Sequence, residues 1–254
     1  MSDSIKRVVQ ENFSKSKEAY VTSSTHSNQS DLDTLTDWLR PQSSWTILDI
    51  ATGGGHVAKQ LSPYVNNVFA NDLTKDMLGN TAKHMQNLQN LHYVVADAED
   101  LPFLEQSFDA VTCRIAPHHF PNPKQFVNEV HRVLKTGSYF LMIDNVAPQD
   151  EGLDHFYNSF EKMRDTSHSR ALKISEWKNL LHESHFSLRR ELTRKKTLPF
   201  DDWANRTLDS KGVTKVENYF KQSSEEQSKY FHIKLEAEQV LEFSIDEWMV
   251  LCTK

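Results

Sequence analysis

Short apolar runs alternate with helical patterns through roughly the first 147 residues of the chain. Five such runs predict buried strands at residues 46–50, 68–70, 91–96, 108–115 and 138–143. The intervening patterns predict helices over 30–39, 56–63, 75–88 and 126–134, with Ser30 capping the first and Gly137 closing the last. Parallel strands need crossover connections, nearly always right-handed, and this alternation supplies them. We therefore expect a doubly wound α/β fold around a mostly parallel sheet.

The rhythm changes beyond about residue 150. Ser175 is expected to cap a helix that carries Trp177. Apolar runs at 186–192 and 248–252 predict two more strands that pair at the sheet edge, the last one antiparallel, which makes seven strands. A helical insertion is expected between them at about 200–235. We expect residues 1–40 to form a helical lid segment, with Phe13, Tyr20 and His26 as candidate lid residues, and 41–254 to form the main domain.

The charge and cysteine content exclude several other classes of protein. The formal net charge is −6, from 29 Lys and Arg against 35 Asp and Glu, so no nucleic-acid footprint is expected. No apolar run approaches the ~20 residues of a membrane span, and the first residues lack the apolar stretch of a signal peptide. Two cysteines, Cys113 and Cys252, cannot build a disulfide scaffold or a four-cysteine zinc site. We expect a cytoplasmic chain with reduced cysteines.

Glycines and aspartates gather where the predicted strands end. The chain has only 7 glycines in 254 residues, and three of them are consecutive at 53–55, after the first strand. Asp49, Asp72 and Asp97 stand at the ends of the first, second and third strands. Ligands of such sheets bind outside the carboxyl ends of the strands. Three acids in this register indicate a ligand rich in hydroxyl and amino donors.

The glycine turn alone suits two cofactors. Residues 53–58 satisfy the G-x-G-x-x-[GA] fingerprint, and Asp72 follows at the distance of a ribose-binding acid, so NAD fits as well as S-adenosylmethionine. Asp49 favours the second cofactor, because a carboxylate just ahead of the turn would repel a pyrophosphate. The same carboxylate would attract a sulfonium and an α-ammonium, while a helix N-terminus can receive the methionine carboxylate.

Four stretches resemble known motifs. Residues 47–55 (ILDIATGGG) look like the first motif of class I S-adenosylmethionine-dependent methyltransferases, and 71–78 (NDLTKDML) resemble the second-strand motif of the ubiquinone/menaquinone-biosynthesis-like branch. Residues 97–103 (DAEDLPF), 107–109 (SFD) and 132–137 (RVLKTG) are similar to later motifs of that branch, in the same order. A closer likeness, to small bacterial methyltransferases of unassigned substrate, extends through 164–168 and 175–177. The resemblance implies a Rossmann-like fold that binds S-adenosylmethionine.

The resemblance also implies roles for particular residues. Gly53 and Gly55 would let the backbone approach the methionine moiety, Asp72 would accept the ribose hydroxyls and Leu73 would cover the adenine. The remaining residues expected at the cofactor are Asp49, Ala51, Met77, Asp97, Ala98 and Glu99, with Asp97 and the Ala98 N–H directed at the adenine. Two departures from the motif are Ala51, in place of the usual first glycine, and Thr136–Ser138. Ala51 is acceptable if its φ is negative.

Each of these residues could instead have a purely structural role. The glycines could form only a tight turn, Asp72 could cap the helix over 75–88, and Asp97 could cap a turn. Asp49 could orient the glycine loop without touching the ligand.

Candidate acceptor-site residues follow the fourth strand. His119, or His118, could deprotonate a hydroxyl acceptor, since the pKa of histidine suits a general base. Both could instead only hydrogen-bond the loop. Arg114 could bind an acidic substrate or pair with an aspartate, and Asp144 after the fifth strand is a further candidate.

Other polar clusters are expected to be ordinary surface. The group Arg164, Asp165, His168 and Arg170 could line a substrate pocket, but a solvated helix face with internal ion pairs is the favoured interpretation. His182 and His185 lack a carboxylate partner in pattern and are expected at the surface. We see no ligand set for a metal. The aromatic residues of the insertion, such as Trp203 and Phe220, are expected to form core or to wall an apolar pocket.

These observations together predict an S-adenosylmethionine-dependent methyltransferase acting on a small molecule, with S-adenosylhomocysteine as product. The branch resemblance implies C- or O-methylation of an aromatic or quinone-like acceptor, by a monomer or homodimer. Alternatives are an RNA or protein methyltransferase on the same fold, a non-catalytic S-adenosylmethionine-binding protein, and, least favoured, an NAD-dependent oxidoreductase.

Overall fold

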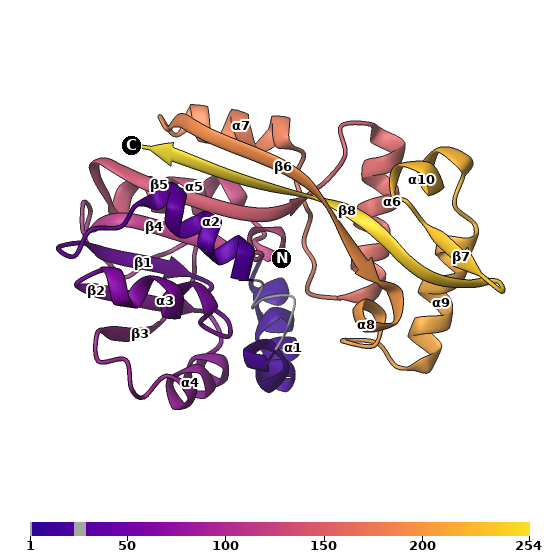
Figure 1. The fold of residues 1–254 in the computed structure, drawn as a ribbon, viewed down its shortest axis with the longest axis horizontal. Coiled ribbons are helices and arrows are strands. Elements are labelled where there is room, and N and C mark those ends of the chain that lie inside the picture. The colour runs from indigo at the N-terminus through magenta and orange to yellow at the C-terminus, as the bar shows by residue number, and fades with distance from the viewer. Residues whose placement is uncertain (1, 23–28) are drawn as a thin grey trace.

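The computed structural model describes residues 2–22 and 29–254, which form one mixed sheet with helices around it (Figure 1). The strands are β1 (Thr46–Ile50), β2 (Asn67–Asp72), β3 (Leu91–Val95), β4 (Phe108–Arg114), β5 (Leu134–Val146), β6 (Ser187–Pro199), β7 (Lys234–Glu236) and β8 (Gln239–Thr253). The helices are α1 (Ser2–Thr22), α2 (Gln29–Leu39), α3 (His56–Leu61), α4 (Lys75–His84), α5 (Pro123–Val133), α6 (Glu151–Arg164), α7 (Ile174–Glu183), α8 (Phe200–Ala204), α9 (Ser210–Lys221) and α10 (Glu225–Tyr230), with 3-10 turns η1 (Ser62–Tyr64) and η2 (Pro117–His119).

The sheet has the strand order β3-β2-β1-β4-β5-β8-β6. Strands β1 to β5 pair in parallel, and β8 is antiparallel to both β5 and β6. The predicted doubly wound fold with an antiparallel last strand is therefore confirmed. The first five strands read as continuous apolar runs because helices cover both faces of this part of the sheet.

The sheet path contains the expected seven strands, and a short eighth strand, β7, lies off it. Strand β7 pairs with the start of β8 across a two-residue turn at Ala237 and Glu238, whose φ angles are 45° and 64°. Positive φ at both central positions matches the right-handed twist of a hairpin. The turn contains neither glycine nor asparagine, so the usual sequence signal for such a hairpin is missing.

The last two long strands extend well beyond the predicted runs. Strand β6 has 13 residues and β8 has 15, and both cross from the main sheet into a second lobe that contains α6, α8, α9 and α10 (Figure 1). Aromatic side chains from α6, α8, α9 and β8 pack together there, among them Phe160, Trp203, Phe220 and Phe243. The helical insertion of 200–235 is therefore part of a separate core that shares two strands with the sheet.

Four local expectations at helix ends are wrong. Helix α2 begins at Gln29, so Ser30 lies inside it, and α4 ends at His84 instead of near 88. Gly137 does not close α5, because β5 begins directly after that helix and the Gly137 N–H donates to the Lys254 carbonyl, 3.0 Å away. Ser175 lies within α7, which begins at Ile174, and its hydroxyl donates to Gln149.

Helix α1 lies beside α4, at the side of the sheet where the parallel strands end (Figure 1). Phe13 is partly buried there, whereas His26 and the side chain of Tyr20 lie outside the described residues. None of the described helices is long and apolar enough to cross a membrane.

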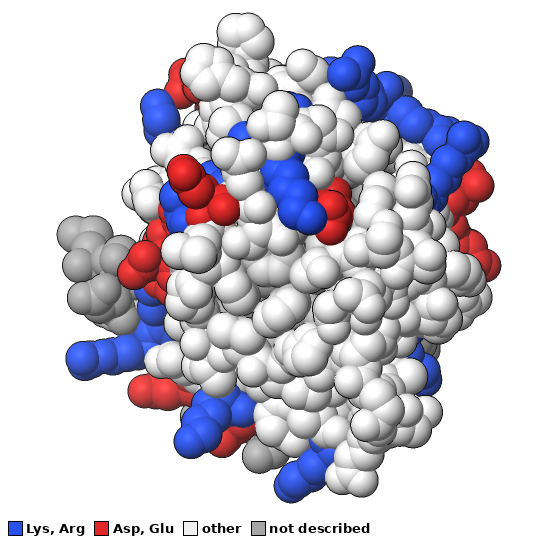
Figure 2. Space-filling model, turned by 90° about the vertical axis from the view of Figure 1, so that its left-hand side faces the viewer, with Lys and Arg blue, Asp and Glu red and all other residues white. Residues whose placement is uncertain are grey.

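The face shown in Figure 2 is covered mostly by uncharged residues. Basic and acidic side chains form small groups in the upper part of this face and along its edges. This face carries no broad basic surface of the kind that nucleic-acid binding requires.

Candidate cofactor and acceptor site

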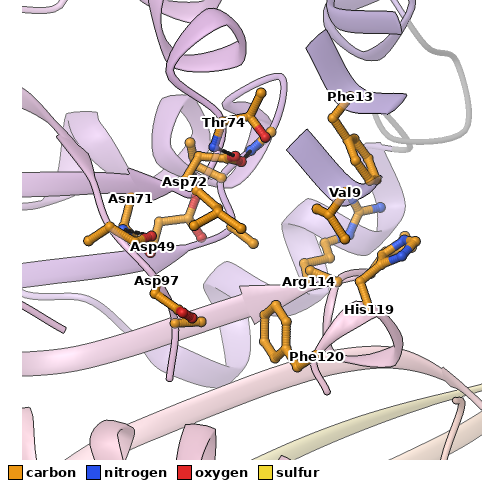
Figure 3. A pocket seen from close by; sticks show the side chains of 18 of the residues that line it. Val9, Phe13, Asp49, Asn71, Asp72, Thr74, Asp97, Arg114, His119 and Phe120 are labelled. Carbon is orange, nitrogen blue, oxygen red and sulfur yellow. Dashed lines mark hydrogen bonds between the residues drawn. The ribbon is translucent and has the colours of Figure 1, made fainter. Parts of the chain in front are cut away.

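A cavity lies at the carboxyl ends of the parallel strands, with α1 along one side (Figure 3). Most of the residues expected at the cofactor line it: Asp49, Ala51, Gly53, Asp72, Leu73, Asp97, Ala98 and Glu99. Gly55 and Met77 lie outside this lining. Met77 is a fully buried residue of α4, and Gly55 packs against Thr81 and Met85.

The loop between β1 and α3 needs glycine at two positions. Gly53 and Gly55 have φ angles of 53° and 76°, in the left-handed region that favours glycine. A Cβ on Gly55 would lie 2.5 Å from Met85 Cε and 2.6 Å from Thr81 Cγ2. Gly55 therefore serves packing of the loop on α4. Ala51 has φ 51°, so the expectation of a negative φ is wrong and this alanine occupies a strained conformation.

Asp49 both orients the loop and faces the cavity. Its carboxylate accepts hydrogen bonds from the hydroxyls of Thr52, at 2.6 Å, and Thr112, at 2.8 Å. Burial raises the pKa of Asp49 to about 6, against the opposing effect of these hydroxyls and of Arg114. A buried carboxylate with a raised pKa is one that a cationic ligand would stabilise.

Asp72 ends β2 and holds two backbone N–H groups. Its carboxylate accepts from Thr74, at 2.8 Å, and from Gly53, at 3.1 Å (Figure 3). Burial raises its pKa, although these backbone bonds oppose the shift. Asp72 thus ties the glycine loop to the start of α4 while it lines the cavity, so the capping role and the ligand-binding role are compatible.

Asp97 and Glu99 contact Lys6 of α1, a residue that the motifs did not reveal. Lys6 Nζ lies 2.6 Å from Asp97 Oδ2 and 2.6 Å from Glu99 Oε2. Burial lowers the pKa of Lys6, but the two carboxylates outweigh it and the pKa is raised. Gln10 of the same helix donates to the Leu73 carbonyl at 3.1 Å. Helix α1 is therefore attached to residues that line the cavity.

His118 and His119 follow β4 in η2, and both are buried. His118 Nδ1 lies 2.6 Å from Asp144 Oδ1, and the His118 backbone N–H donates to the same carboxylate. Burial lowers the pKa of His118, but the charge and hydrogen bond of Asp144 outweigh it, so the pKa is raised. Asp144, a secondary candidate in the sequence, is therefore the partner that would let His118 hold a proton.

His119 has the opposite character. Burial, and then the neighbouring His118, lower the pKa of His119 to about 3, so the ring is neutral at ordinary pH. Its Nδ1 lies 3.1 Å from the Ser167 carbonyl, which fixes the proton on that nitrogen. The Phe13 ring of α1 packs edge-on against it at 5.2 Å between ring centroids (Figure 3). His119 can accept a hydrogen bond but is a weak base.

Arg114, the third candidate, belongs to a buried chain of charges. Its Nη2 donates to Asp31 of α2 at 3.1 Å, and the other oxygen of Asp31 lies 2.6 Å from Arg194 of β6. Arg194 also contacts Glu247 of β8. Arg114 therefore pairs with an aspartate, which is one of the two roles expected from the sequence. It also lines the cavity.

The expectation of a solvated face for residues 164–170 is wrong for most of the group. Asp165 and His168 are buried, and only Arg170 is substantially exposed, where it pairs with Asp154 and Glu176. Arg164 pairs with Glu161, and both line a second cavity. The loop folds inward because the Ser169 and Arg170 N–H groups both donate to the His118 carbonyl.

The second cavity adjoins the first. Phe13, Ile115 and His119 line both, and Figure 3 shows Phe13 and His119 facing each other at the edge of the first. His118 lines only the second cavity. Sequence reasoning missed Lys196, Arg206 and Asn145 here, since none belongs to a motif.

Two remaining expectations concern metals and thiols. His182 and His185 are exposed, as predicted. Within residues 2–22 and 29–254, no group of three His, Cys, Asp or Glu side chains is arranged to hold a metal ion. Cys113 and Cys252 are free and buried, and burial raises the pKa of both thiols, which makes them poor nucleophiles.

Comparisons with known proteins agree with the geometry. A family described as a methyltransferase domain matches residues 48–142. YcgJ of Bacillus subtilis (strain 168), described as a methyltransferase without a stated substrate, is 34% identical over 196 residues, 76% of this chain and 78% of its own length. A C-methyltransferase of ubiquinone/menaquinone biosynthesis, UbiE of Rickettsia typhi, is 33% identical over 129 residues, 47% of this chain and 52% of its own length.

A solved structure gives the same result over most of the chain. A protein of Bacillus halodurans C-125, classed as a methyltransferase, superposes with a TM-score of 0.86 at 39% identity, covering 89% of this chain and 99% of its own.

The strand order, the glycine loop and the acids at the strand ends define a class I S-adenosylmethionine-dependent methyltransferase. Within that class, the chain belongs to the methyltransferase family that includes YcgJ of Bacillus subtilis, and it resembles the ubiquinone/menaquinone-biosynthesis methyltransferases over about half of its length.

Proposed function

We propose that this methyltransferase binds S-adenosylmethionine in the first cavity and methylates carbon or oxygen of a small molecule in the second. The observation that carries the proposal is the row of carboxylates facing the first cavity. Asp49 is buried there, and its pKa is raised to about 6. A positively charged ligand would stabilise the ionised form of such a carboxylate. Gly53 and Asp72 leave room for a ribose beside it.

The residues present fit the cofactor in detail. Asp49 would face its positive groups, Asp72 its ribose hydroxyls, and Asp97 with the Ala98 N–H its adenine. Leu73 would cover the ring, and Glu99 would hold the loop, since its Oε1 accepts from the Asn122 N–H at 2.6 Å. When bound, S-adenosylmethionine supplies an already activated methyl group, so most of the reactivity belongs to the cofactor.

The chain's own part in the reaction is then positioning and proton handling. Phe13 and His119 line both cavities, so they stand where the methyl group of the cofactor and the acceptor would meet. Positioning of this kind can supply up to ~7–11 kcal/mol of the barrier. The neutral form of His118, whose pKa the Asp144 carboxylate raises, is suited to take the proton that an acceptor hydroxyl or carbon acid gives up. His119 would accept a hydrogen bond and orient the acceptor.

Calorimetric titration with S-adenosylhomocysteine tests the proposal, with NAD in a parallel titration. We expect saturable micromolar binding of S-adenosylhomocysteine alone, weakened at least tenfold in Asp72→Asn. The matched control Asp76→Asn removes the same charge from an exposed position on α4 and should bind like the wild type. Tight NAD binding, or no S-adenosylhomocysteine binding by the folded protein, would contradict the proposal.

A further inference from the structure

The second cavity has a chemical character that the cofactor site does not explain. It lies between η2, α6, β6, β8 and the segment after α8, on the far side of His119 from the glycine loop. Three cationic side chains line it: Arg164, Lys196 and Arg206. Among its described lining residues, Glu161 is the one carboxylate.

The carboxylates near these cations are already shared. Glu161 Oε2 lies 2.9 Å from Arg164 Nη2, while its Oε1 accepts from the indole N–H of Trp203 at 3.2 Å. Glu247 is 3.3 Å from Lys196 Nζ, but it also contacts Arg194. Each of these acids is thus shared between two donors. The lining itself holds three cationic side chains and one carboxylate, so it carries more positive than negative charge.

The cations are held in place by the second lobe. The Arg164 guanidinium lies 5.5 Å from the centroid of the Trp203 ring, a cation–π contact. Lys196 projects from β6, whose pairing with β8 is continuous through this region, and its side chain is only 18% exposed. A rigid and largely buried cation binds an anion more strongly than a surface lysine does, because less water screens it.

Two further features of the second cavity indicate what the rest of a ligand would be like. Asn145 Oδ1 is buried beside this cavity and, among the described residues, has no hydrogen-bond partner, so an N–H or O–H donor on a ligand would satisfy it. Leu198, Ile245 and the Trp203 ring supply apolar wall. The cavity therefore combines an apolar side with a cationic end.

We propose that the second cavity is an acid-binding acceptor subsite, in which Lys196, Arg164 and Arg206 hold a carboxylate or phosphate of the methyl acceptor. The inference rests on the proposed function, since it assigns this cavity to the acceptor. It narrows the acceptor from any aromatic or quinone-like compound to one that carries an anionic group. Arg114 is not part of this subsite, because it lines the first cavity and not the second.

Titration calorimetry with matched small probes tests the subsite on the full chain saturated with S-adenosylhomocysteine. The probes are benzoate and phenyl phosphate, with benzamide as the neutral counterpart of benzoate. We expect at least one of the two acids to bind at least tenfold more tightly than benzamide. The stronger of the two identifies the anion as carboxylate or phosphate.

Substitutions then locate the binding. Lys196→Met should weaken binding of the acid at least tenfold and leave S-adenosylhomocysteine binding unchanged. Lys195→Met is the matched control: it removes the same charge from the neighbouring position of β6, where the lysine instead contacts Asp246 and the Tyr230 ring. It should bind the acid as the wild type does, and thermal melting would confirm that both variants are folded.

The outcomes separate the two proposals. Binding of both acids no tighter than that of benzamide, no binding of either acid, or equal losses in Lys196→Met and Lys195→Met would overturn the acid subsite while cofactor binding stands. Failure of S-adenosylhomocysteine to bind would instead overturn the proposed function.

Discussion

At the scale of single residues, the protonation of Asp49 connects the cofactor site to pH. Its pKa of about 6 means that the carboxyl begins to take up a proton as the pH falls toward that value. The α-ammonium of S-adenosylhomocysteine favours the ionised form. We therefore expect the dissociation constant to be constant above about pH 7 and to rise below pH 6, toward tenfold per pH unit for one proton. Calorimetry from pH 5 to 8 measures this dissociation constant. Asp49→Asn should bind S-adenosylhomocysteine more weakly, and its dissociation constant should depend less steeply on pH. An unchanged pH dependence in the variant would mean that another group is responsible.

Ala51 tests whether the loop stores strain. The left-handed region costs a residue with a Cβ about 1–2 kcal/mol, whereas glycine loses about 0.5–1 kcal/mol of unfolded-state entropy. With φ at 51°, Ala51→Gly should raise the free energy of unfolding by about 0.5–1 kcal/mol in urea denaturation. The same change in helix α3, Ala58→Gly, should lower it by about 1 kcal/mol. A loss of stability in both variants would show that position 51 is not strained.

The contact between His118 and Asp144 makes a third residue-scale prediction. Burial alone would lower the pKa of His118, and the Asp144 carboxylate reverses that direction. Asp144→Asn removes the charge but keeps the shape, so the His118 pKa should fall below its ordinary value. NMR titration of the imidazole signals measures this, with exposed His182 as an internal reference that should not move. A His118 pKa that stays raised in the variant would mean that other charges control it.

At the scale of elements, the parts that local sequence specifies were predicted well. Strands β1, β3 and β4 lie within one residue of expectation, because each is a short, mostly apolar run between polar segments. Strand β6 was cut short in the prediction because its second half, 193–199, is rich in Lys, Arg and Thr and resembles a loop. Its partner β8 defines it as a strand, and pairing between distant segments is not written in local periodicity.

The residues of the site also fall into those that the local sequence indicates and those that only tertiary packing brings together. Asp49, Asp72 and Asp97 stand in motifs at strand ends, so their common cavity could be predicted. Lys6 and Lys196 reach the site from segments far away in sequence, and no pattern around either residue indicates it. Tertiary packing alone brings them there.

Movement of helix α1 away from the strand ends would open the first cavity to a ligand. Lys6 joins it to Asp97 and Glu99 at 2.6 Å, in a pair that is partly exposed. Pairs of this kind contribute up to ~1 kcal/mol, about fivefold in an equilibrium. Lys6→Met should therefore speed both association and release of S-adenosylhomocysteine about fivefold in stopped-flow experiments. Lys75→Met, at an exposed position of α4, should change neither rate; equal rates in all three proteins would mean that α1 does not limit entry.

At the scale of the whole molecule, the two lobes share β6 and β8 without a break, so we expect them to unfold together. Phe220 is fully buried in the second lobe, 4.8 Å from both Phe160 and Phe243 between ring centroids. Phe220→Ala should lower the free energy of unfolding by about 3–5 kcal/mol. Because β8 also pairs with β5, amide exchange in β1 and β4 should speed up by the same free energy as exchange in β8. Leu104→Ala, at a side chain that is 84% exposed, should change neither. Loss of protection confined to the second lobe would show two independent units, and the acceptor cavity between them would then be free to open without disturbing the cofactor site.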